Sequence, residues 1–274
     1  MPLRIDIVTL FPELYAPLLS TSIPRRAADK GHVSYHITDI RSFGEGNYNK
    51  VDDRPFGGGP GMVMMAPILA AAVDAAEAQD ERPARRVILT PTGRPFSHEL
   101  ATKYAGVERL LLIATHYEGY DERFVEEYQP DEVSIGDFVL SGGELAAMVV
   151  LDAVVRLVPG VLGHDEGASE DSFASGADGL LEHPHYTRPR EWRGRAVPGV
   201  LMGGDHAAIA RWRREQREAR TRQRRPDLFA PYEARLREAE AERQARKAAR
   251  RRGRGAPPPE TGGSESGGPG ATGG

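Results

Sequence analysis

Three short glycine-containing segments combine backbone groups, small apolar side chains and carboxylates in a way that suits ligand binding. Glycine permits positive φ and close backbone approach, and we expect positive φ at Gly119 and Gly142. The segments hold no Lys or Arg and no GxxxxGK[ST] sequence, so they are not built for phosphate. They suit a nucleoside with a positive charge, although each segment alone can also be an ordinary connecting turn. They read Thr90-Pro91-Thr92-Gly93, Thr115-His116-Tyr117-Glu118-Gly119 and Ser134-Ile135-Gly136-Asp137-Phe138-Val139-Leu140-Ser141-Gly142-Gly143.

Each of these segments follows a predicted buried strand, which places all three at one edge of a sheet. Ligands of open α/β sheets bind at the carboxyl edge of the strands. The predicted strands are residues 3–11, 33–40, 85–90, 109–115 and 131–136. The predicted helices are residues 12–31, 67–79, 97–106 and 144–160, with two Arg-rich helices at roughly 205–222 and 227–252, and 41–61 is a long polar loop. This alternation predicts an α/β fold with a mostly parallel sheet.

The helix expected over 144–160 is apolar nearly all round, which predicts that it is buried or lies at a subunit interface. The chain has no cysteine, so disulfides and thiolate metal sites are excluded. Its first residues, MPLRIDIVTLF, lack the apolar core of a signal peptide, and no apolar run approaches the roughly 20 residues that span a bilayer. We expect a cytoplasmic protein.

The charge of the chain is divided unevenly along its length. Residues 1–187 carry 15 Lys and Arg against 29 Asp and Glu, whereas residues 188–274 carry 21 against 11. A basic, arginine-rich end predicts contact with a polyanion, although solvated, salt-bridged helices have the same composition. We expect a ligand-binding α/β domain over 1–162, a flexible linker over 163–180, a basic helical domain over 181–252 and a disordered tail over 253–274.

Six segments occur together in an order typical of one family. They are VDDRPFGGGPGMVM (51–64), YEGYDERF (117–124), SIGDFVLSGGE (134–144), EDSF (170–173), LLEHPHYTRP (180–189) and RRPDL (224–228). Over roughly residues 3–229 the chain closely resembles the bacterial tRNA (guanine-N1)-methyltransferases, which modify the guanosine at position 37, 3′ of the anticodon. The family usually has Gly-Arg where this chain has Thr115-His116.

The resemblance implies a SPOUT-type α/β domain with a deep trefoil knot, an exception to unknotted topology. It implies S-adenosylmethionine as the methyl donor, magnesium dependence, and a homodimer with its active site at the subunit interface. It also implies that the glycine segments wrap the donor. The implied cofactor-binding residues are Pro91, Thr92, Gly93, Thr115, Tyr117, Glu118, Gly119, Ser134, Ile135, Gly136, Asp137, Phe138, Val139, Leu140, Gly142 and Gly143.

The resemblance assigns two catalytic residues. Guanine N1 carries a proton at neutral pH, so its methylation needs a base and a cation that stabilises charge on O6. The implied base is Asp171 and the implied cation is Arg156. From the residues alone, Asp171 could equally cap a helix, and Arg156 could be an ordinary interface residue.

The basic domain is expected to bind the anticodon stem-loop of tRNA, with the target base splayed out of the loop. His183 and His185 could also be read as a metal pair, but no third ligand lies nearby in the sequence. The candidate tRNA-binding residues are His185, Tyr186, Arg188, Arg211, Arg213, Arg220, Arg222, Arg224 and Arg225.

Two other functions fit parts of the sequence. The first is a related knotted enzyme that methylates a ribose 2′-hydroxyl of RNA, which would not depend on Asp171 or on guanine. The second is a non-catalytic RNA-binding protein that uses the basic domain alone. Such a protein would not need the three glycine segments and would have no affinity for S-adenosylmethionine.

Overall fold

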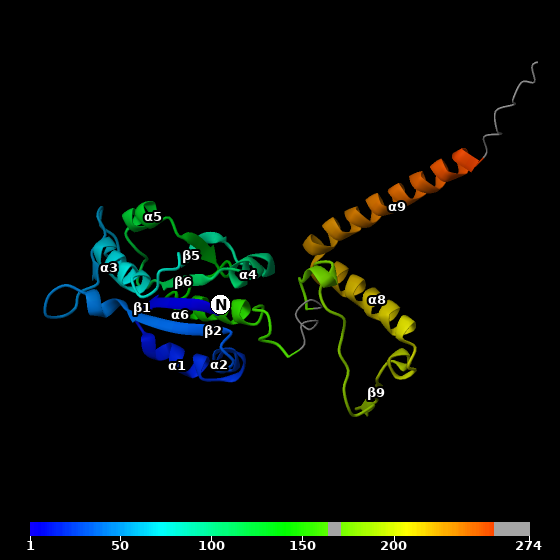
Figure 1. The fold of residues 1–274 in the computed structure, drawn as a ribbon, viewed down its shortest axis with the longest axis horizontal. Helices are drawn as coiled ribbons and strands as arrows, with labels where there is room; N and C mark the ends of the chain where they lie inside the picture. The colour runs from blue at the N-terminus through cyan, green and yellow to red at the C-terminus, as the bar shows by residue number, and fades with distance from the viewer. Residues whose placement is uncertain (164–170, 255–274) are drawn as a thin grey trace, which may run out of the picture. The chain divides into compact units, whose positions relative to one another are not determined.

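The computed structural model describes residues 1–163 and 171–254, and by their contacts these form two units (Figure 1). The first unit is Met1–Glu182 and the second begins at His183. Residues 171–180, expected as part of the linker, belong to the first unit. The rest of that linker, 164–170, and residues 255–274 of the expected tail lie outside the described residues.

Five strands of the first unit form one sheet in which every neighbouring pair is parallel. The order is β2–β1–β6–β5–β7, so β6 lies in the middle, and all six of its residues are buried, as a central parallel strand requires. The predicted α/β fold with a mostly parallel sheet is confirmed. The strands are β1 Leu3–Thr9, β2 Val33–Asp39, β5 Arg85–Pro95, β6 Arg109–Ala114 and β7 Asp131–Ser134.

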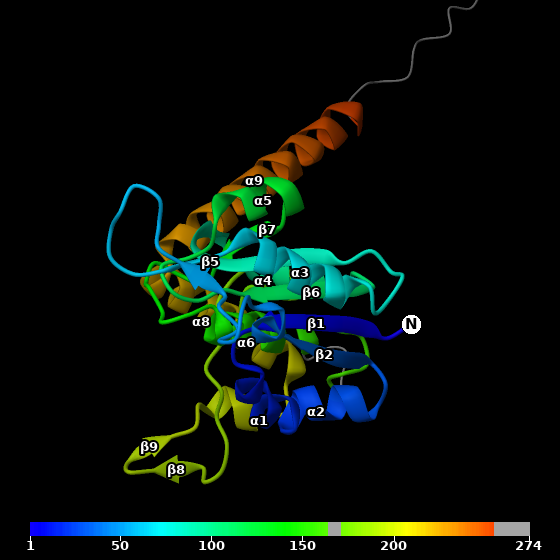
Figure 2. The ribbon, with the colours of Figure 1, turned by 90° about the vertical axis from the view of Figure 1, so that its left-hand side faces the viewer.

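Helices cover both faces of the sheet, with α3 on one side and α1 and α2 on the other (Figures 1 and 2). The side chains of each strand alternate between the two layers, so Leu110 and Leu112 pack in one core and Leu111 and Ile113 in the other. One layer holds α1 Tyr15–Leu19, α2 Ser22–Asp29, α4 His98–Ala105 and α6 Glu144–Val155. The other holds the 3₁₀ helix η2 Ile40–Phe43, α3 Ala66–Glu77 and α5 Glu122–Tyr128.

Three local predictions are wrong. The helix expected over 12–31 is divided into η1 Pro12–Leu14, α1 and α2, because the Ser20 and Thr21 hydroxyls both donate to the Pro17 carbonyl oxygen. The expected loop over 41–61 contains η2 and the strand β3 Asp52–Asp53, which pairs with β4 Val63–Met64. The turn expected after residue 90 lies inside β5, as a bulge between Leu89 and Arg94.

A buried ion pair ties the sheet to the end of α3. Arg109 is 1% exposed, and its Nε lies 2.7 Å from Oδ2 of Asp6 on β1. Its two terminal nitrogens donate to the carbonyl oxygens of Ala76, Glu77, Asp80 and Arg82. The guanidinium therefore binds four carbonyl oxygens at and beyond the C-terminal end of α3.

Replacing Arg109 with methionine is expected to lower the free energy of unfolding by about 3–5 kcal/mol, because it leaves the buried Asp6 carboxylate without this partner. Urea unfolding followed by circular dichroism measures the change. The control is Arg85→Met, which breaks the half-exposed Arg85–Asp131 pair and should cost about 1 kcal/mol or less. Equal losses of unfolding free energy in the two variants would show that the buried Arg109 contacts stabilise the fold no more than the half-exposed Arg85–Asp131 pair does.

The second unit contains a short hairpin and two long helices. The predicted helices over 205–222 and 227–252 are present as α8 His206–Arg224 and α9 Pro226–Arg254. Asp205 caps α8, accepting a hydrogen bond from the Ala208 N–H at 3.0 Å. The remaining elements are η3 Ser175–Ala177 in the first unit, and β8 Glu191–Trp192, β9 Arg195–Ala196 and η4 Gly199–Met202 in the second. No helix within 1–163 or 171–254 is long and apolar enough to cross a membrane.

Candidate functional site

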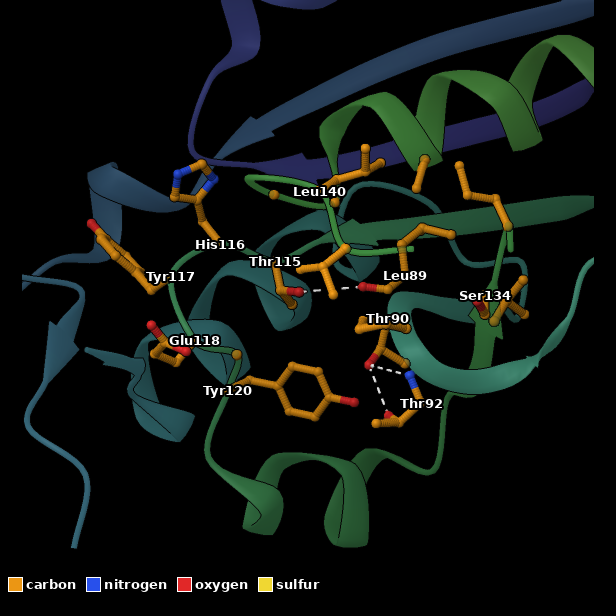
Figure 3. Close-up of a pocket in the computed structure, with 18 of the residues that line it drawn as sticks. Leu89, Thr90, Thr92, Thr115, His116, Tyr117, Glu118, Tyr120, Ser134 and Leu140 are labelled. Carbon is orange, nitrogen blue, oxygen red and sulfur yellow. Dashed lines mark hydrogen bonds between the residues drawn. The ribbon is translucent and has the colours of Figure 1, made fainter. Parts of the chain in front are cut away.

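A cavity of about 320 Å³ opens where β5, β6 and β7 end (Figure 3). This is the carboxyl edge of the parallel sheet, where ligands of such folds bind. Its walls come from the three glycine segments and from neighbouring strand ends. The lining residues are Val63, Leu89, Thr90, Pro91, Thr92, Thr115, His116, Tyr117, Glu118, Gly119, Tyr120, Glu122, Val133, Ser134, Ile135, Gly136, Phe138, Val139, Leu140, Gly142, Gly143 and Ala146.

All of the predicted cofactor-binding residues line this cavity except Gly93 and Asp137. Gly93 has a different role, because a Cβ atom there would clash with the Val133 backbone nitrogen. It therefore lets β5 and β7 approach closely at the bulge. Asp137 is exposed. The structure thus gathers the three segments around one space, as their positions after three adjacent strands predict.

The glycines of the cavity act in two different ways. Gly119 has a φ of 137°, and a Cβ atom there would have nothing within 4 Å, so the backbone conformation and not a lack of space requires glycine. The expectation of positive φ at Gly142 is wrong. A Cβ at Gly142 would clash with His116 Nδ1 and Glu144 Oε2, so that position lacks space for a side chain.

A second part of the chain, which the sequence did not indicate, holds the 115–121 loop in place. The Glu118 N–H donates to the Met62 carbonyl oxygen at 3.0 Å, and the Met64 N–H donates to that of Gly119 at 2.9 Å. These bonds attach the β3–β4 hairpin to the cavity and support Tyr117, whose φ of 63° is unusual for a non-glycine residue. Because of this attachment Val63 lines the cavity.

Several other lining residues were missed by the sequence reasoning. Thr90 and His116 stand inside the quoted segments, so their position was available as a signal. Tyr120 follows directly on YEG, and its hydroxyl donates to Glu132 Oε2 at 3.0 Å. The rest, which are ordinary strand, loop or helix residues and carry no recognisable signal, are Val63, Leu89, Glu122, Val133 and Ala146.

The polar side chains of the cavity are neutral hydroxyls, carboxylates and the imidazole of His116. Thr115 Oγ1 donates to the Leu89 carbonyl oxygen at 3.3 Å, and the Thr90 and Thr92 hydroxyls lie 2.9 Å apart. Burial raises the pKa of Tyr120 far above its ordinary value, so this phenol stays protonated and can act as a hydrogen-bond donor at neutral pH. With no Lys or Arg among its lining residues, the cavity favours a neutral or cationic ligand.

The two residues implied as catalytic contact each other directly. Arg156 Nη2 lies 2.6 Å from Asp171 Oδ2, and the side chains are 43% and 31% exposed. Neither residue lines the cavity. Arg156 follows the last residue of α6, whereas Gly143 precedes the first, so the 12 residues of α6 separate them by about 18 Å.

The second unit contains an aromatic cluster formed by residues from two segments. The rings of His183 and His185 lie 4.7 Å apart, and the indole of Trp212 on α8 lies 6.4 Å from His183 and 6.2 Å from Tyr186. Burial lowers the pKa of His183, so its ring is neutral at neutral pH. Sequence reasoning missed Trp212. Within the described residues, no group of three or more His, Asp or Glu side chains could hold a metal ion.

The candidate tRNA-binding arginines differ in their surroundings. Arg225 Nη2 lies 2.6 Å from Asp227 Oδ2, and the Arg222 guanidinium lies 4.4 Å from the centre of the Phe229 ring. These two residues therefore contribute to the junction of α8 and α9. Four other candidate arginines are exposed, namely Arg188 in the segment before α8 and Arg211, Arg213 and Arg224 on α8. Arg220, also on α8, is partly exposed.

A parallel α/β sheet whose carboxyl-edge loops enclose a cavity without Lys or Arg is typical of α/β proteins that bind a neutral or cationic ligand at this edge. The sequence profile described as tRNA (Guanine-1)-methyltransferase TrmD matches residues 3–231. The chain belongs to this family, whose fold is the SPOUT knotted fold. The motif-based prediction of the family, and of an enzyme that methylates tRNA guanine, is confirmed.

Curated relatives named tRNA (guanine-N(1)-)-methyltransferase match most of the chain. That of Geobacter sulfurreducens is 53% identical over 228 residues, which cover 83% of this chain and 91% of the relative. That of Albidiferax ferrireducens is 50% identical over 227 residues, or 83% of this chain and 92% of the relative. That of Chloroflexus aurantiacus is 52% identical over 228 residues, which cover 83% of this chain and 88% of the relative.

Proposed function

We propose that this protein transfers a methyl group from S-adenosylmethionine to N1 of the guanosine at tRNA position 37. The observation that carries the proposal is the cavity, because two of the three segments that form its walls overlap the family motifs at 117–124 and 134–144. The protein would act as a homodimer in the cytoplasm. Magnesium dependence stays a prediction, since the described residues offer no metal-binding group of three side chains.

The cavity suits S-adenosylmethionine in charge and shape. When bound, this donor supplies a methyl group carried on a positively charged sulfur. The backbone around Gly119, Gly136 and Gly142 would hold the nucleoside, and Ile135 and Leu140 would provide apolar contacts to its base. The acidic Glu118 and Glu122 and the absence of a lining cation suit a positively charged ligand.

Asp171 and Arg156 would act on the guanine. The Asp171 carboxylate would accept the proton of N1, which turns N1 into a nucleophile. The Arg156 guanidinium would donate hydrogen bonds to O6, where negative charge develops. Their direct contact supports this division, because it places a base and a cation side by side, as the N1–H and O6 of guanine are.

A second copy of the chain would bring the two halves of this site together. The cavity and the Arg156–Asp171 pair lie toward opposite ends of α6, about 18 Å apart, which is too far to act on one base within one chain. α6 also exposes apolar side chains, with Leu145 58% and Val149 49% exposed. Antiparallel contact of two α6 helices would bury this surface and bring the cavity of one copy toward the ion pair of the other.

The second unit would bind the tRNA backbone through its exposed arginines. Replacing Arg213 and Arg224 with alanine should weaken tRNA binding and flatten the log–log salt slope by about 1.4 to 1.8, because each lost phosphate contact contributes about 0.7 to 0.9. A salt titration of tRNA affinity measures this. The control pair Arg25→Ala and Lys30→Ala, exposed on the first unit, should leave the slope unchanged. An unchanged slope in the Arg213 and Arg224 variant would mean that α8 does not contact phosphates.

The proposed reaction is tested with purified protein, labelled S-adenosylmethionine and tRNA transcripts that carry guanosine or adenosine at position 37. Nucleoside analysis should find 1-methylguanosine only in the first transcript. A label on ribose would favour the 2′-hydroxyl enzyme instead. The absence of label from both transcripts, with tRNA binding retained, would favour a non-catalytic RNA-binding protein.

A further inference from the structure

Glu144 is a buried carboxylate beside the cavity that the proposed reaction does not use. It is the first residue of α6, and its side chain is 5% exposed. Its Oε1 has no hydrogen-bond partner among the described residues. A buried, unpaired carboxylate oxygen costs folding free energy, so its retention calls for a role.

The carboxylate lies directly behind the cavity wall. A Cβ at Gly142, which lines the cavity, would clash with Glu144 Oε2. Because Gly142 has no side chain, the Glu144 carboxylate lies close to the backbone that borders the ligand space. The N-terminal end of α6 favours a negative charge at this position.

His116 is the cavity residue that contacts this carboxylate. Its Nδ1 lies 3.4 Å from Glu144 Oε2, and its ring packs edge-on against Phe11 and Tyr117 at 5.1 and 5.3 Å. Histidine is the side chain whose charge changes between about pH 5 and 8. A protonated His116 neutralises Glu144, whereas a neutral His116 leaves the carboxylate charge uncompensated by this neighbour.

Other charged or titratable groups surround the pair. From α1, Tyr15 donates its hydroxyl hydrogen to the Glu144 backbone oxygen at 3.4 Å, and burial and Glu144 raise its pKa far above the ordinary value, so it stays neutral. The guanidinium carbon of Arg41, from η2, lies 5.9 Å from the centre of the Phe11 ring. Burial and the Asp52 carboxylate of β3 raise the pKa of the Tyr117 phenol.

We propose that Glu144 is a specificity-determining residue that favours the cationic methyl donor over its neutral-sulfur product. The inference rests on the proposed function, because it assumes a sulfonium ligand. The donor carries one positive charge more than S-adenosylhomocysteine. A buried negative charge next to the cavity wall acts through a lower dielectric than the exposed Glu118 and Glu122, and so discriminates more strongly.

The test is calorimetric binding of S-adenosylmethionine and S-adenosylhomocysteine to the full-length protein. The selectivity is the ratio of the two dissociation constants, product over donor. Glu144→Gln is expected to lower it about tenfold, mainly by weakening donor binding. The matched control is Glu126→Gln, which removes an exposed carboxylate on α5 that does not line the cavity and should change the ratio less than about twofold.

Each outcome has a distinct meaning. Equal weakening of both ligands by Glu144→Gln would overturn the inference while leaving the proposed function intact. If the wild-type protein binds neither ligand, the proposed function itself fails. Product binding by Glu144→Gln also reports that this variant is folded.

Discussion

Replacing Asp171 with asparagine is expected to lower the rate of tRNA methylation by about 10²–10⁴-fold, the usual weight of a general base. Asparagine keeps the size of the side chain and can still accept a hydrogen bond from Arg156, but it cannot take the N1 proton. Asp171 does not line the cavity, so S-adenosylmethionine affinity should be unchanged. Single-turnover rates and calorimetry measure the two quantities.

The matched control is Asp29→Asn, which alters another Arg–Asp pair, Arg25–Asp29, on the exposed end of α2. It should methylate tRNA at the wild-type rate. If Asp171→Asn keeps a rate within threefold of the wild-type rate, Asp171 is not the base. A large loss of donor affinity would instead mean that Asp171 belongs to the donor site.

Replacing Gly142 with valine is expected to weaken S-adenosylmethionine binding by about 10- to 100-fold. The new Cβ would clash with His116 and Glu144 and displace the loop that forms one wall of the cavity. Overpacking of this kind costs about 1–3 kcal/mol, which converts to that range of affinity. Calorimetric titration with S-adenosylmethionine measures the loss.

The control is Gly199→Val in the second unit, where a Cβ would have nothing within 4 Å. Its donor affinity should equal that of the wild-type protein. Normal affinity in Gly142→Val would remove the 134–143 loop from the donor site. A change in the unfolding midpoint, measured in parallel, separates a local effect on the loop from general unfolding.

The sheet and its covering helices were predictable because local pattern determines them. The segment 109–115 is a continuous apolar run of strand length, the segment 67–79 is an uninterrupted run of helix-forming residues, and the structure has β6 and α3 there. The errors occur where side-chain hydrogen bonds or long-range pairing override pattern. Ser20 and Thr21 interrupt a helix by bonding to a carbonyl, and the 90–93 turn is a bulge only because β7 pairs on both sides of it.

The loops of the candidate site were predictable from the sequence, whereas the contacts between their side chains were not. Motifs identify residues such as Gly119 and Gly142, but the lack of space at Gly142 depends on His116 and Glu144, which only the folded chain brings together. The Arg156–Asp171 contact likewise joins a helix end to a segment 15 residues later. The knot came from resemblance alone, since periodicity carries no information on chain threading.

The most direct test of a site shared by two copies mixes the Gly142→Val and Asp171→Asn proteins after dissociation and reassociation, and measures 1-methylguanosine in tRNA. Each variant alone should be nearly inactive. In a mixed dimer, one site combines an intact cavity with an intact Asp171, so an equal mixture should recover about a quarter of wild-type activity. No recovery, with mixed dimers present and the wild-type protein active, would contradict the account by placing both halves of the site in one chain.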